Sequence, residues 1–316
     1  MMYSDEDKCK FVSTIGIRNI ADYVLFKNEF NLVYFFPEIS GKNKIVYLKP
    51  CYKEIKYLCD NLSKIKESFF IILSGNDINI PYEIEDEHFK SILYSDKVLG
   101  IFAQNLYIKH DDVYAHKFFP IPIGIDYHTL KSSKKMHEWG GYPNMNPVVQ
   151  EKVLNRCILN TKPIDKCDPR YVYTNFQTTM DMPPMRRILN RRPLYDLIHK
   201  KSWIKFLPNS KRSNFWEEIS DKVFVLCPPG NGMDTHRTWE VLMLGRIPII
   251  KKLPINDVYD KLPVWIIDDW EDFSKLETED FVIKHKEFCE KWNSYDFSRL
   301  TLEYWRNYIK DHVSRM

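Results

Sequence analysis

The sequence predicts an α/β protein with two domains, built from parallel sheets with helices on both faces. Short apolar runs alternate with helical patterns along the whole chain, which favours parallel sheets over a sandwich or a helical bundle. The chain has 316 residues, of which 44% are hydrophobic, enough for two buried cores at roughly 150 residues per domain. Residues 131–147 are rich in Ser, Gly, Pro and Asn without apolar periodicity, so we expect domains 1–140 and 141–316.

Each half of the chain contains several apolar runs of strand length, separated by segments with helix periodicity. In the first half the expected strands are 32–36, 45–48, 69–73, 98–103 and 118–121, and the expected helices are 52–65 and 85–93. In the second half the expected strands are 171–173, 203–207, 223–227, 247–250 and 264–267, and the expected helices are 148–159, 185–200, 213–220 and 234–244. Two or three helices rich in aromatic residues close the chain, and we expect these residues to pack against a neighbouring domain.

Composition excludes several classes of protein. Lys and Arg number 46 against 43 for Asp and Glu, with no long block of one sign, so nucleic acid is not expected as a partner. A local phosphate pocket remains compatible with this balance, because it needs only one or two basic side chains and a helix N-terminus. The 7 cysteines show no CxxC or zinc spacing, which indicates a reducing compartment. Without a signal peptide or a long apolar segment, the expected protein is soluble and cytoplasmic, with no transmembrane segment.

The stretch that says most about chemistry is VFVLCPPGNGMDTHRTWEVLMLGRIPII, residues 223–250. It reads as a buried strand, a Gly-rich turn, a helix that ends at Gly245 and a second strand, which together form one βαβ unit. Parallel sheets bind ligands beyond the carboxyl ends of their strands. The turn and the start of the helix are therefore the expected position of a ligand.

The polar face of this helix suits a nucleoside diphosphate. His236, Arg237 and Glu240 lie three and four residues apart and so share one face. Backbone N–H groups and the helix dipole favour a phosphate at the helix N-terminus, while Glu240 is placed for ribose hydroxyls. The glycines of the turn would let the backbone approach the ligand closely. The turn residues assigned to this donor site are Gly230, Asn231, Gly232 and Asp234.

The same residues could also have purely structural roles, without binding a ligand. Asp234 would cap the helix, Arg237 and Glu240 would form a surface pair, and the glycines would only make a turn. The ligand-binding interpretation is favoured because the turn follows a buried strand and the polar face coincides with the start of the helix.

A family resemblance points to the same kind of site. CPPGNGMDTHRTWEVLMLGRIPII, residues 227–250, resembles the donor-binding signature of exostosin-like glycosyltransferases, and FAQNLYI (102–108) and FFPIPIGIDYHTL (118–130) are similar to segments of soluble relatives. The resemblance implies the GT-B fold, in which two Rossmann-like domains with parallel sheets face a central cleft and the last helix packs back on the first domain. Residues 1–140 would form the acceptor side and residues 141–316 would bind the donor. The implied activity in glycan biosynthesis is inverting transfer of a sugar from a nucleoside-diphosphate sugar to a hydroxyl of a glycan or glycoconjugate, with no metal or other cofactor.

Direct displacement at an anomeric carbon needs a general base on the acceptor side. Asp77 follows the apolar run 69–73 in LSGND and is the first candidate. Asp126 and His128 follow FFPIPIGI, where Gly124 permits an unusual turn. Each candidate also has a structural interpretation, as a turn aspartate, a helix cap or a hinge histidine.

Two residues of the second half are expected to contact the diphosphate. Asn175 follows the expected strand 171–173, and Arg187 lies on the next helix, where Arg186 and Arg191 are alternatives to it. Two other functions stay open: an inactive protein that binds nucleotide sugars or glycans, and a nucleotide-sugar epimerase of the same architecture. An NAD-dependent dehydrogenase is disfavoured, because neither half opens with a GxGxxG turn.

Overall fold

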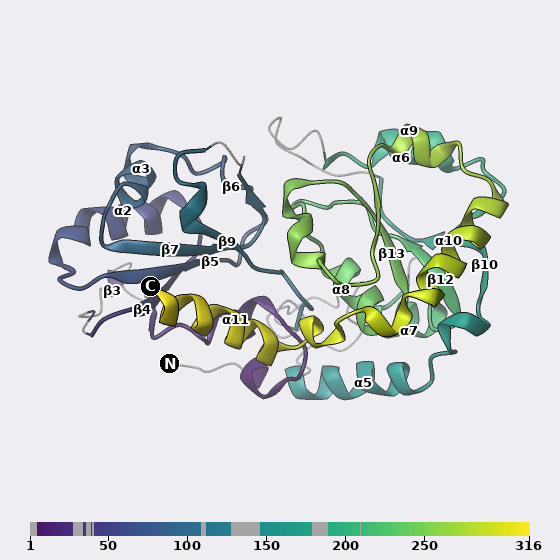
Figure 1. Cartoon of the computed structure of the whole chain (residues 1–316), viewed down its shortest axis with the longest axis horizontal. Coiled ribbons are helices and arrows are strands. Elements are labelled where there is room, and N and C mark those ends of the chain that lie inside the picture. Colours follow the sequence, from purple (N-terminus) through teal and green to yellow (C-terminus); the bar gives the residue numbers. More distant parts are fainter. Residues whose placement is uncertain are drawn as a thin grey trace.

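The computed structural model describes residues 5–27, 34–35, 39, 41–108, 112–127, 146–178, 189–208 and 210–316. These residues form two five-stranded sheets, side by side, in which all neighbouring strands pair in parallel (Figure 1). The expected α/β class with two Rossmann-like parallel sheets is therefore confirmed. The junction near residue 140 lies outside the described residues, so the division into 1–140 and 141–316 stays a prediction.

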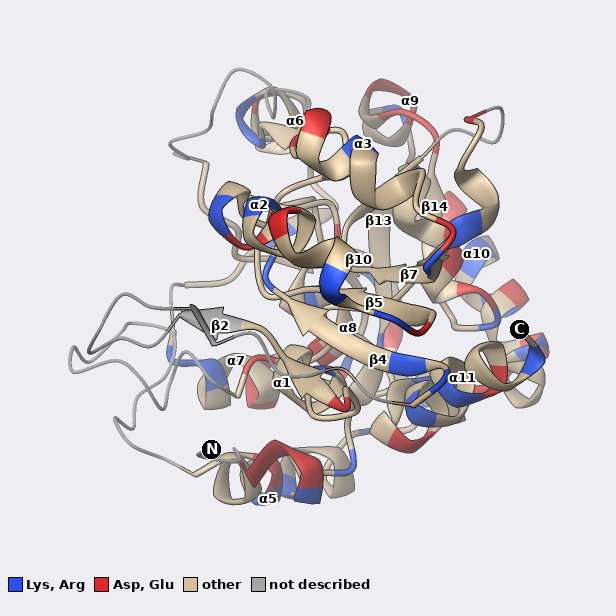
Figure 2. Ribbon diagram, turned by 90° about the vertical axis from the view of Figure 1, so that its left-hand side faces the viewer, with Lys and Arg blue, Asp and Glu red and all other residues tan. Residues whose placement is uncertain are grey.

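The first sheet follows chain order. Its strands are β1 (Tyr23–Val24), β4 (Lys44–Leu48), β5 (Phe69–Leu73), β7 (Val98–Ala103) and β9 (Phe118–Pro120). All five side chains of the central strand β5 are buried, as expected for a strand that is covered on both faces. Helices α2 (Tyr52–Asn61) and α3 (Glu87–Leu93) lie on one face, while α1 (Thr14–Arg18) and α11 (Leu302–Arg315) lie on the other (Figure 2).

The C-terminal helix α11 returns from the second half of the chain to the first sheet. The rings of Tyr308 and His312 lie 6.3 and 6.1 Å from the ring of Phe102 on β7. Near the end of the helix, Asn43 Nδ2 donates a hydrogen bond to the Val313 carbonyl at 3.2 Å. The aromatic residues of this helix therefore pack as core, as the sequence predicts.

The segment expected as a first strand, 32–36, differs from the prediction. Its described part, β3 (Tyr34–Phe35), pairs antiparallel with β2 (Phe26–Lys27), while β1 forms the edge of the main sheet. Two further short strands, β6 (Ile80–Pro81) and β8 (Leu106–Tyr107), pair beyond the carboxyl ends of β5 and β7. Strands of two residues are too short to show an alternating pattern, so the sequence gives no signal for them.

The second sheet contains a switch in winding direction. Its strands are β10 (Asp168–Thr174), β11 (Ile204–Phe206), β12 (Lys222–Leu226), β13 (Ile247–Lys251) and β14 (Trp265–Ile267), in the spatial order β11-β10-β12-β13-β14. The direction reverses between β10 and β12, which is the position where open parallel sheets bind ligands. The helices of this half are α5 (Pro147–Leu159), α6 (Arg192–Ile198), α7 (Arg212–Glu218), α8 (His236–Met243), α9 (Trp270–Ser274) and α10 (Thr278–Glu290).

Several helix bounds differ from the sequence prediction. The helix expected over 52–65 is divided into α2 and the 3-10 helix η2 (Leu62–Lys64). The helix expected over 234–244 begins at His236, because the backbone of Thr235 is extended, with φ −132° and ψ 140°. Further 3-10 helices are η1 (Asp5–Lys8), η3 (Ala115–Lys117), η4 (Ile164–Lys166), η6 (Pro254–Tyr259), η7 (Trp292–Ser294) and η8 (Phe297–Leu300).

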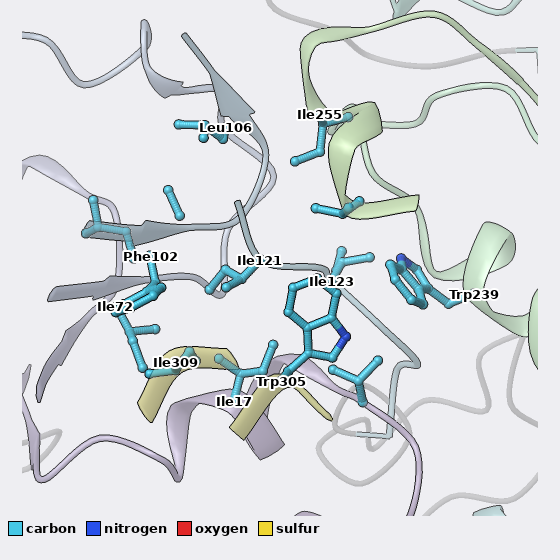
Figure 3. Close-up of a cluster of buried hydrophobic side chains, with 14 of the residues drawn as sticks. Ile17, Ile72, Phe102, Leu106, Ile121, Ile123, Trp239, Ile255, Trp305 and Ile309 are labelled. Atoms are coloured by element: carbon cyan, nitrogen blue, oxygen red, sulfur yellow. The ribbon is translucent and has the colours of Figure 1, made fainter. Parts of the chain in front are cut away.

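A hydrophobic cluster joins the two sheets (Figure 3). Ile121 and Ile123, which follow β9, belong to one buried cluster with Trp305 of α11 and Trp239 of α8. All four side chains are buried, and each such burial contributes about 1.5–3 kcal/mol. Apolar packing therefore holds the two sheets in one fixed arrangement around the segment that follows β9.

Gly124 in this segment is tightly enclosed. Its φ is +64°, and an added Cβ would lie 2.1 Å from the Val12 carbonyl oxygen. Gly124→Ala is therefore expected to lower the free energy of unfolding by more than about 2 kcal/mol, as measured by urea denaturation. Gly245→Ala is the matched control, since Gly245 has φ +62° but no atom within 4 Å of an added Cβ. Equal losses in the two variants would contradict the importance of the Val12 contact.

Candidate functional site

A pocket of about 380 Å³ lies between the carboxyl ends of the two sheets. This volume is within the range of small-molecule sites. Three lining residues come from the first half of the chain and the others from the second. The lining residues are Asp77, Ile123, Asp126, Phe176, Arg191, Arg212, Leu226, Cys227, Pro228, Gly230, Asn231, Gly232, Asp234, Thr235, His236, Arg237 and Glu240.

The pocket is located at the switch point of the second sheet. Phe176 follows β10, and the turn 227–235 follows the neighbouring strand β12. Helix α8 then begins, and its residues His236, Arg237 and Glu240 all line the pocket. The Thr235 side chain makes no capping hydrogen bond, so the start of α8 has no capping side chain. A helix N-terminus of this kind favours an anion.

Arg237 is held in the pocket wall by contacts with Phe215, Asn175 and Glu240. Its guanidinium lies 3.7 Å from the ring centroid of Phe215, and Nη1 donates a hydrogen bond to Asn175 Oδ1. Its Nε lies 3.6 Å from Glu240 Oε2. Burial lowers the pKa of Arg237 from its usual value, although the group remains a cation at neutral pH. Asn175 thus orients an arginine, whereas the sequence predicts it as a diphosphate contact.

Arg191 is a second, half-buried cation in the pocket lining. Its Nε donates to the Pro229 carbonyl at 2.7 Å, and Nη2 lies 3.4 Å from the Pro228 carbonyl. The pKa of Arg191 is lowered to about 10, first by burial and then by the positive charge of Arg237. Among the described carboxylates, none is within ion-pair distance of Arg191. The glycine at 230 makes room for this arginine, because an added Cβ would lie 3.1 Å from its Nη2.

A third arginine uses the carboxylate that the sequence assigns to ribose. Arg212 Nε lies 2.5 Å from Glu240 Oε1, and Arg212 Nη1 donates to the backbone carbonyl of Asp126. Glu240 is 4% exposed and serves both Arg212 and Arg237. Glu240 thus pairs with two arginines in the pocket wall, and its contact with ribose hydroxyls stays a prediction. Two of the three lining arginines thus share one carboxylate, while Asp77, Asp126 and Asp234 also belong to the pocket lining.

Asp234 is held by hydrogen bonds from several parts of the chain, and its predicted donor contact stays a prediction. It is 2% exposed, and its oxygens accept hydrogen bonds from the Ile123 N–H at 2.7 Å, Trp239 Nε1 at 2.8 Å and the Tyr259 hydroxyl at 2.5 Å. Burial raises the pKa of this carboxyl, and these three donors act in the opposite direction. Asp234 therefore joins the turn before α8 to the segment that follows β9.

Two neighbours of Asp234 strengthen this junction between the sheets. His236 Nδ1 lies 2.7 Å from the Gly124 carbonyl, which accepts its hydrogen bond. Gly232 packs against Asn105, since an added Cβ would lie 2.7 Å from Asn105 Nδ2. The missing side chain of Gly232 thus accommodates a residue of the first half, whereas the sequence predicts close approach of a ligand.

The base candidates lie on the first-sheet side of the pocket. Asp77 follows β5 and Asp126 follows β9, and both line the pocket. Among the described residues, no hydrogen bond or ion pair engages the Asp77 carboxylate. Two predicted residues, His128 and Arg187, lie outside the described residues, as does Arg186.

Sequence reasoning missed Arg212, Phe215 and Asn105. Arg212 is the first residue of α7, and nothing local distinguishes it from an exposed basic residue at a helix start. The feature that distinguishes Arg212 is its buried partner Glu240, which lies 28 positions later in the sequence and contacts Arg212 only in the folded chain. Asn105 lies within FAQNLYI, a segment that carries part of the family resemblance but has no predicted role of its own.

No group of three or more His, Cys, Asp and Glu side chains could hold a metal ion in the described part of the chain. No described helix is long and apolar enough to cross a membrane.

Sequence comparisons find no relatives: no family model and no curated protein matches the chain. Solved structures with a similar fold include a trehalose-6-phosphate synthase and two glycosyltransferases.

The first is an α,α-trehalose 6-phosphate synthase from Burkholderia multivorans, with a TM-score of 0.41 and 8% identity over 86% of this chain and 72% of that chain. An alpha-glucosyltransferase in complex with UDP and a 13-mer DNA has a TM-score of 0.33 and 13% identity, over 84% and 75% of the chains. WaaG, a glycosyltransferase involved in lipopolysaccharide biosynthesis, has a TM-score of 0.32 and 10% identity, over 87% and 76%. Likeness at these scores does not define an activity, which depends on the chemistry of the pocket.

Proposed function

We propose that this protein is a glycosyltransferase that moves a sugar from a nucleoside-diphosphate sugar to a hydroxyl of a glycan or glycoconjugate. The observation that carries the proposal is the pair of half-buried cations, Arg191 and Arg237, that line the pocket beside the N-terminus of α8. Arg191 has no described carboxylate within ion-pair distance, and the positive charge of Arg237 disfavours its cation further, so an anion beside both arginines would be favourable. A diphosphate offers two adjacent negative groups and would neutralise both arginines and the helix dipole.

The same arrangement supports a displacement without a metal ion. As the bond between the anomeric carbon and the phosphate oxygen breaks, its electron pair leaves with the diphosphate, where Arg191 and Arg237 stabilise the new charge. The acceptor hydroxyl attacks the opposite face of the anomeric carbon, and a carboxylate of the first half removes its proton. Asp77 is the preferred base, with Asp126 as its alternative. One displacement inverts the anomeric centre, so no protein nucleophile takes part.

Membership of the exostosin-like group is part of this proposal. The motif CPPGNGMDTHRTWEVLMLGRIPII supports it, because its turn and helix contribute most of the pocket lining. Arg237 on α8 supplies the charge that such a donor requires.

The proposal is tested by thermal denaturation of the protein with nucleosides, nucleoside monophosphates, diphosphates and nucleoside-diphosphate hexoses. At one fixed concentration, about 100 times the dissociation constant of the diphosphate, we expect the nucleoside diphosphate of one nucleobase to raise the melting temperature by about 5 °C. The monophosphate and the nucleoside of the same nucleobase should raise it progressively less. The shift should be the same with magnesium and with EDTA. Failure of every nucleoside diphosphate to shift the melting temperature would refute the donor site.

A second measurement separates transfer from binding. Release of nucleoside diphosphate from the stabilising nucleotide sugar is followed with a panel of free sugars and oligosaccharides as acceptors. Release that depends on an acceptor supports transfer. Binding with no release would indicate an inactive binding protein, and conversion of the sugar at its 2-hydroxyl position without an acceptor would indicate an epimerase.

A further inference from the structure

Two sequence motifs that are far apart in the chain meet at Asn105. This residue follows β7 within FAQNLYI, is 0% exposed and has φ +51°. Its side chain packs against Gly232 of the turn before α8. A buried amide in the left-handed region combines a backbone conformation that Asn tolerates with one donor group and one acceptor.

Both ends of the Asn105 amide are used. On one side, Oδ1 accepts the backbone N–H of Asp234 at 2.9 Å. On the other side, Nδ2 lies 3.5 Å from the carbonyl of Asn76, which Gln104 Nε2 also approaches at 3.4 Å. One side chain therefore contacts the donor-side turn and the loop that carries Asp77.

The Asp77 loop depends on this pair of amides for its shape. Gln104 Oε1 accepts the Gly75 N–H at 3.3 Å, and the Asn105 carbonyl accepts the Ile80 N–H at 3.0 Å. Asn76 Oδ1 in turn accepts the N–H of Asp77 at 2.8 Å. The backbone on both sides of Asp77 is thus fixed by residues that follow β7.

We infer that Asn105 is a positioning residue that sets the distance between the Asp77 carboxylate and the arginines beside α8. The inference rests on the proposed function, because it assigns the two sides of the pocket to base and leaving group. Displacement requires both groups in register on opposite sides of the anomeric carbon, and an error of about 1 Å can cost about 100-fold in rate.

Asn105→Gly tests this directly, because glycine accepts φ +51° and removes only the side chain. Asn43→Gly is the matched control: Asn43 has φ +55°, and its amide contacts Val313 on α11, far from the pocket lining. The first readout is hydrogen exchange of the Asp234 amide, which needs no substrate. We expect exchange at least about 10-fold faster in Asn105→Gly and unchanged in Asn43→Gly. An unchanged rate in Asn105→Gly would overturn the inference.

The second test combines substitutions on the two sides of the contact between Asn105 and Gly232. Gly232→Ala would displace the Asn105 amide, since all three atoms closest to its Cβ belong to that side chain. We expect Gly232→Ala to accelerate Asp234 exchange as Asn105→Gly does, and the double variant to be no worse than Asn105→Gly alone. Independent, additive effects would contradict the inference.

The third readout uses the nucleoside-diphosphate sugar and the acceptor that support transfer by the wild-type protein. Measured well below the melting temperature, Asn105→Gly should lower kcat at least about 10-fold while KM for the donor changes less than about threefold. A purely structural role would lower the melting temperature and leave kcat of the folded fraction unchanged. If no nucleotide binds the wild-type protein, the proposed function fails, while the exchange measurements still decide whether Asn105 holds the turn.

Discussion

Arg191→Met is expected to weaken binding of the nucleoside diphosphate by about 10- to 100-fold. The charge-assisted hydrogen bonds that the guanidinium would donate to the diphosphate are typically worth about 1.5–3 kcal/mol. Methionine keeps much of the volume and removes a cation that burial and Arg237 already disfavour. The free energy of unfolding without ligand should therefore change by less than about 1 kcal/mol, since relief of this repulsion offsets the missing hydrogen bonds to Pro228 and Pro229. Isothermal titration calorimetry and urea denaturation measure the two quantities.

The neighbouring arginine provides the control. Arg192 has a 61% exposed side chain, and its Nε lies 2.9 Å from Asp196 Oδ1 on the same helix. Arg192→Met should leave nucleotide affinity unchanged, because an exposed ion pair of this kind contributes little. Equal affinity in Arg191→Met and the wild type would contradict the diphosphate site. A collapse of stability in Arg191→Met would show instead that Arg191 mainly supports the turn.

Arg237→Ala is expected to weaken binding of the nucleoside diphosphate by a factor similar to that of Arg191→Met. The physical reason differs in part. The substitution removes a pocket cation and also leaves the Asn175 amide and the Phe215 ring without the guanidinium that they orient. Arg212 remains as the partner of the buried Glu240 carboxylate. The loss of affinity should therefore be accompanied by a measurable loss of stability, which distinguishes Arg237 from Arg191 in the same two measurements.

The sequence predicts the strand–turn–helix unit over 223–250 well because its signals are local. The apolar run that becomes β12, the turn residues and the helix that ends before Gly245 each depend on neighbours within a few positions. The spacing of His236, Arg237 and Glu240 places all three toward the pocket, because helix geometry fixes which residues share a face.

The roles of individual side chains in that unit depend on residues that are distant in the sequence. Asp234 looks like a helix cap or a ligand contact, yet its carboxylate accepts from Ile123, which lies 111 positions earlier. Gly232 is fixed by Asn105 in the same way. Whether a buried polar group faces a ligand or another segment is decided by how the two sheets pack, and no local pattern contains that information.

Asp77→Asn is expected to reduce sugar transfer by about 100- to 10,000-fold, the usual contribution of a general base. The amide has nearly the shape of the carboxylate but cannot accept the proton of the acceptor hydroxyl at neutral pH. Asp77 is on the first-sheet side of the pocket, whereas Arg191 and Arg237 are on the second-sheet side. Nucleoside diphosphate affinity should therefore change by less than about twofold, which calorimetry on the same preparation measures.

Asp126→Asn and Asp60→Asn complete the experiment. Asp126 also lines the pocket, but its backbone carbonyl accepts from Arg212, which holds this residue in the wall that supports Glu240. Asp60 is a surface residue of α2 paired with Lys56, so its substitution should leave transfer unchanged. Full transfer by Asp77→Asn together with loss of transfer in Asp126→Asn would assign the base to Asp126. Full transfer in both variants would require a base outside this pair, and His128 would then be the next residue to replace.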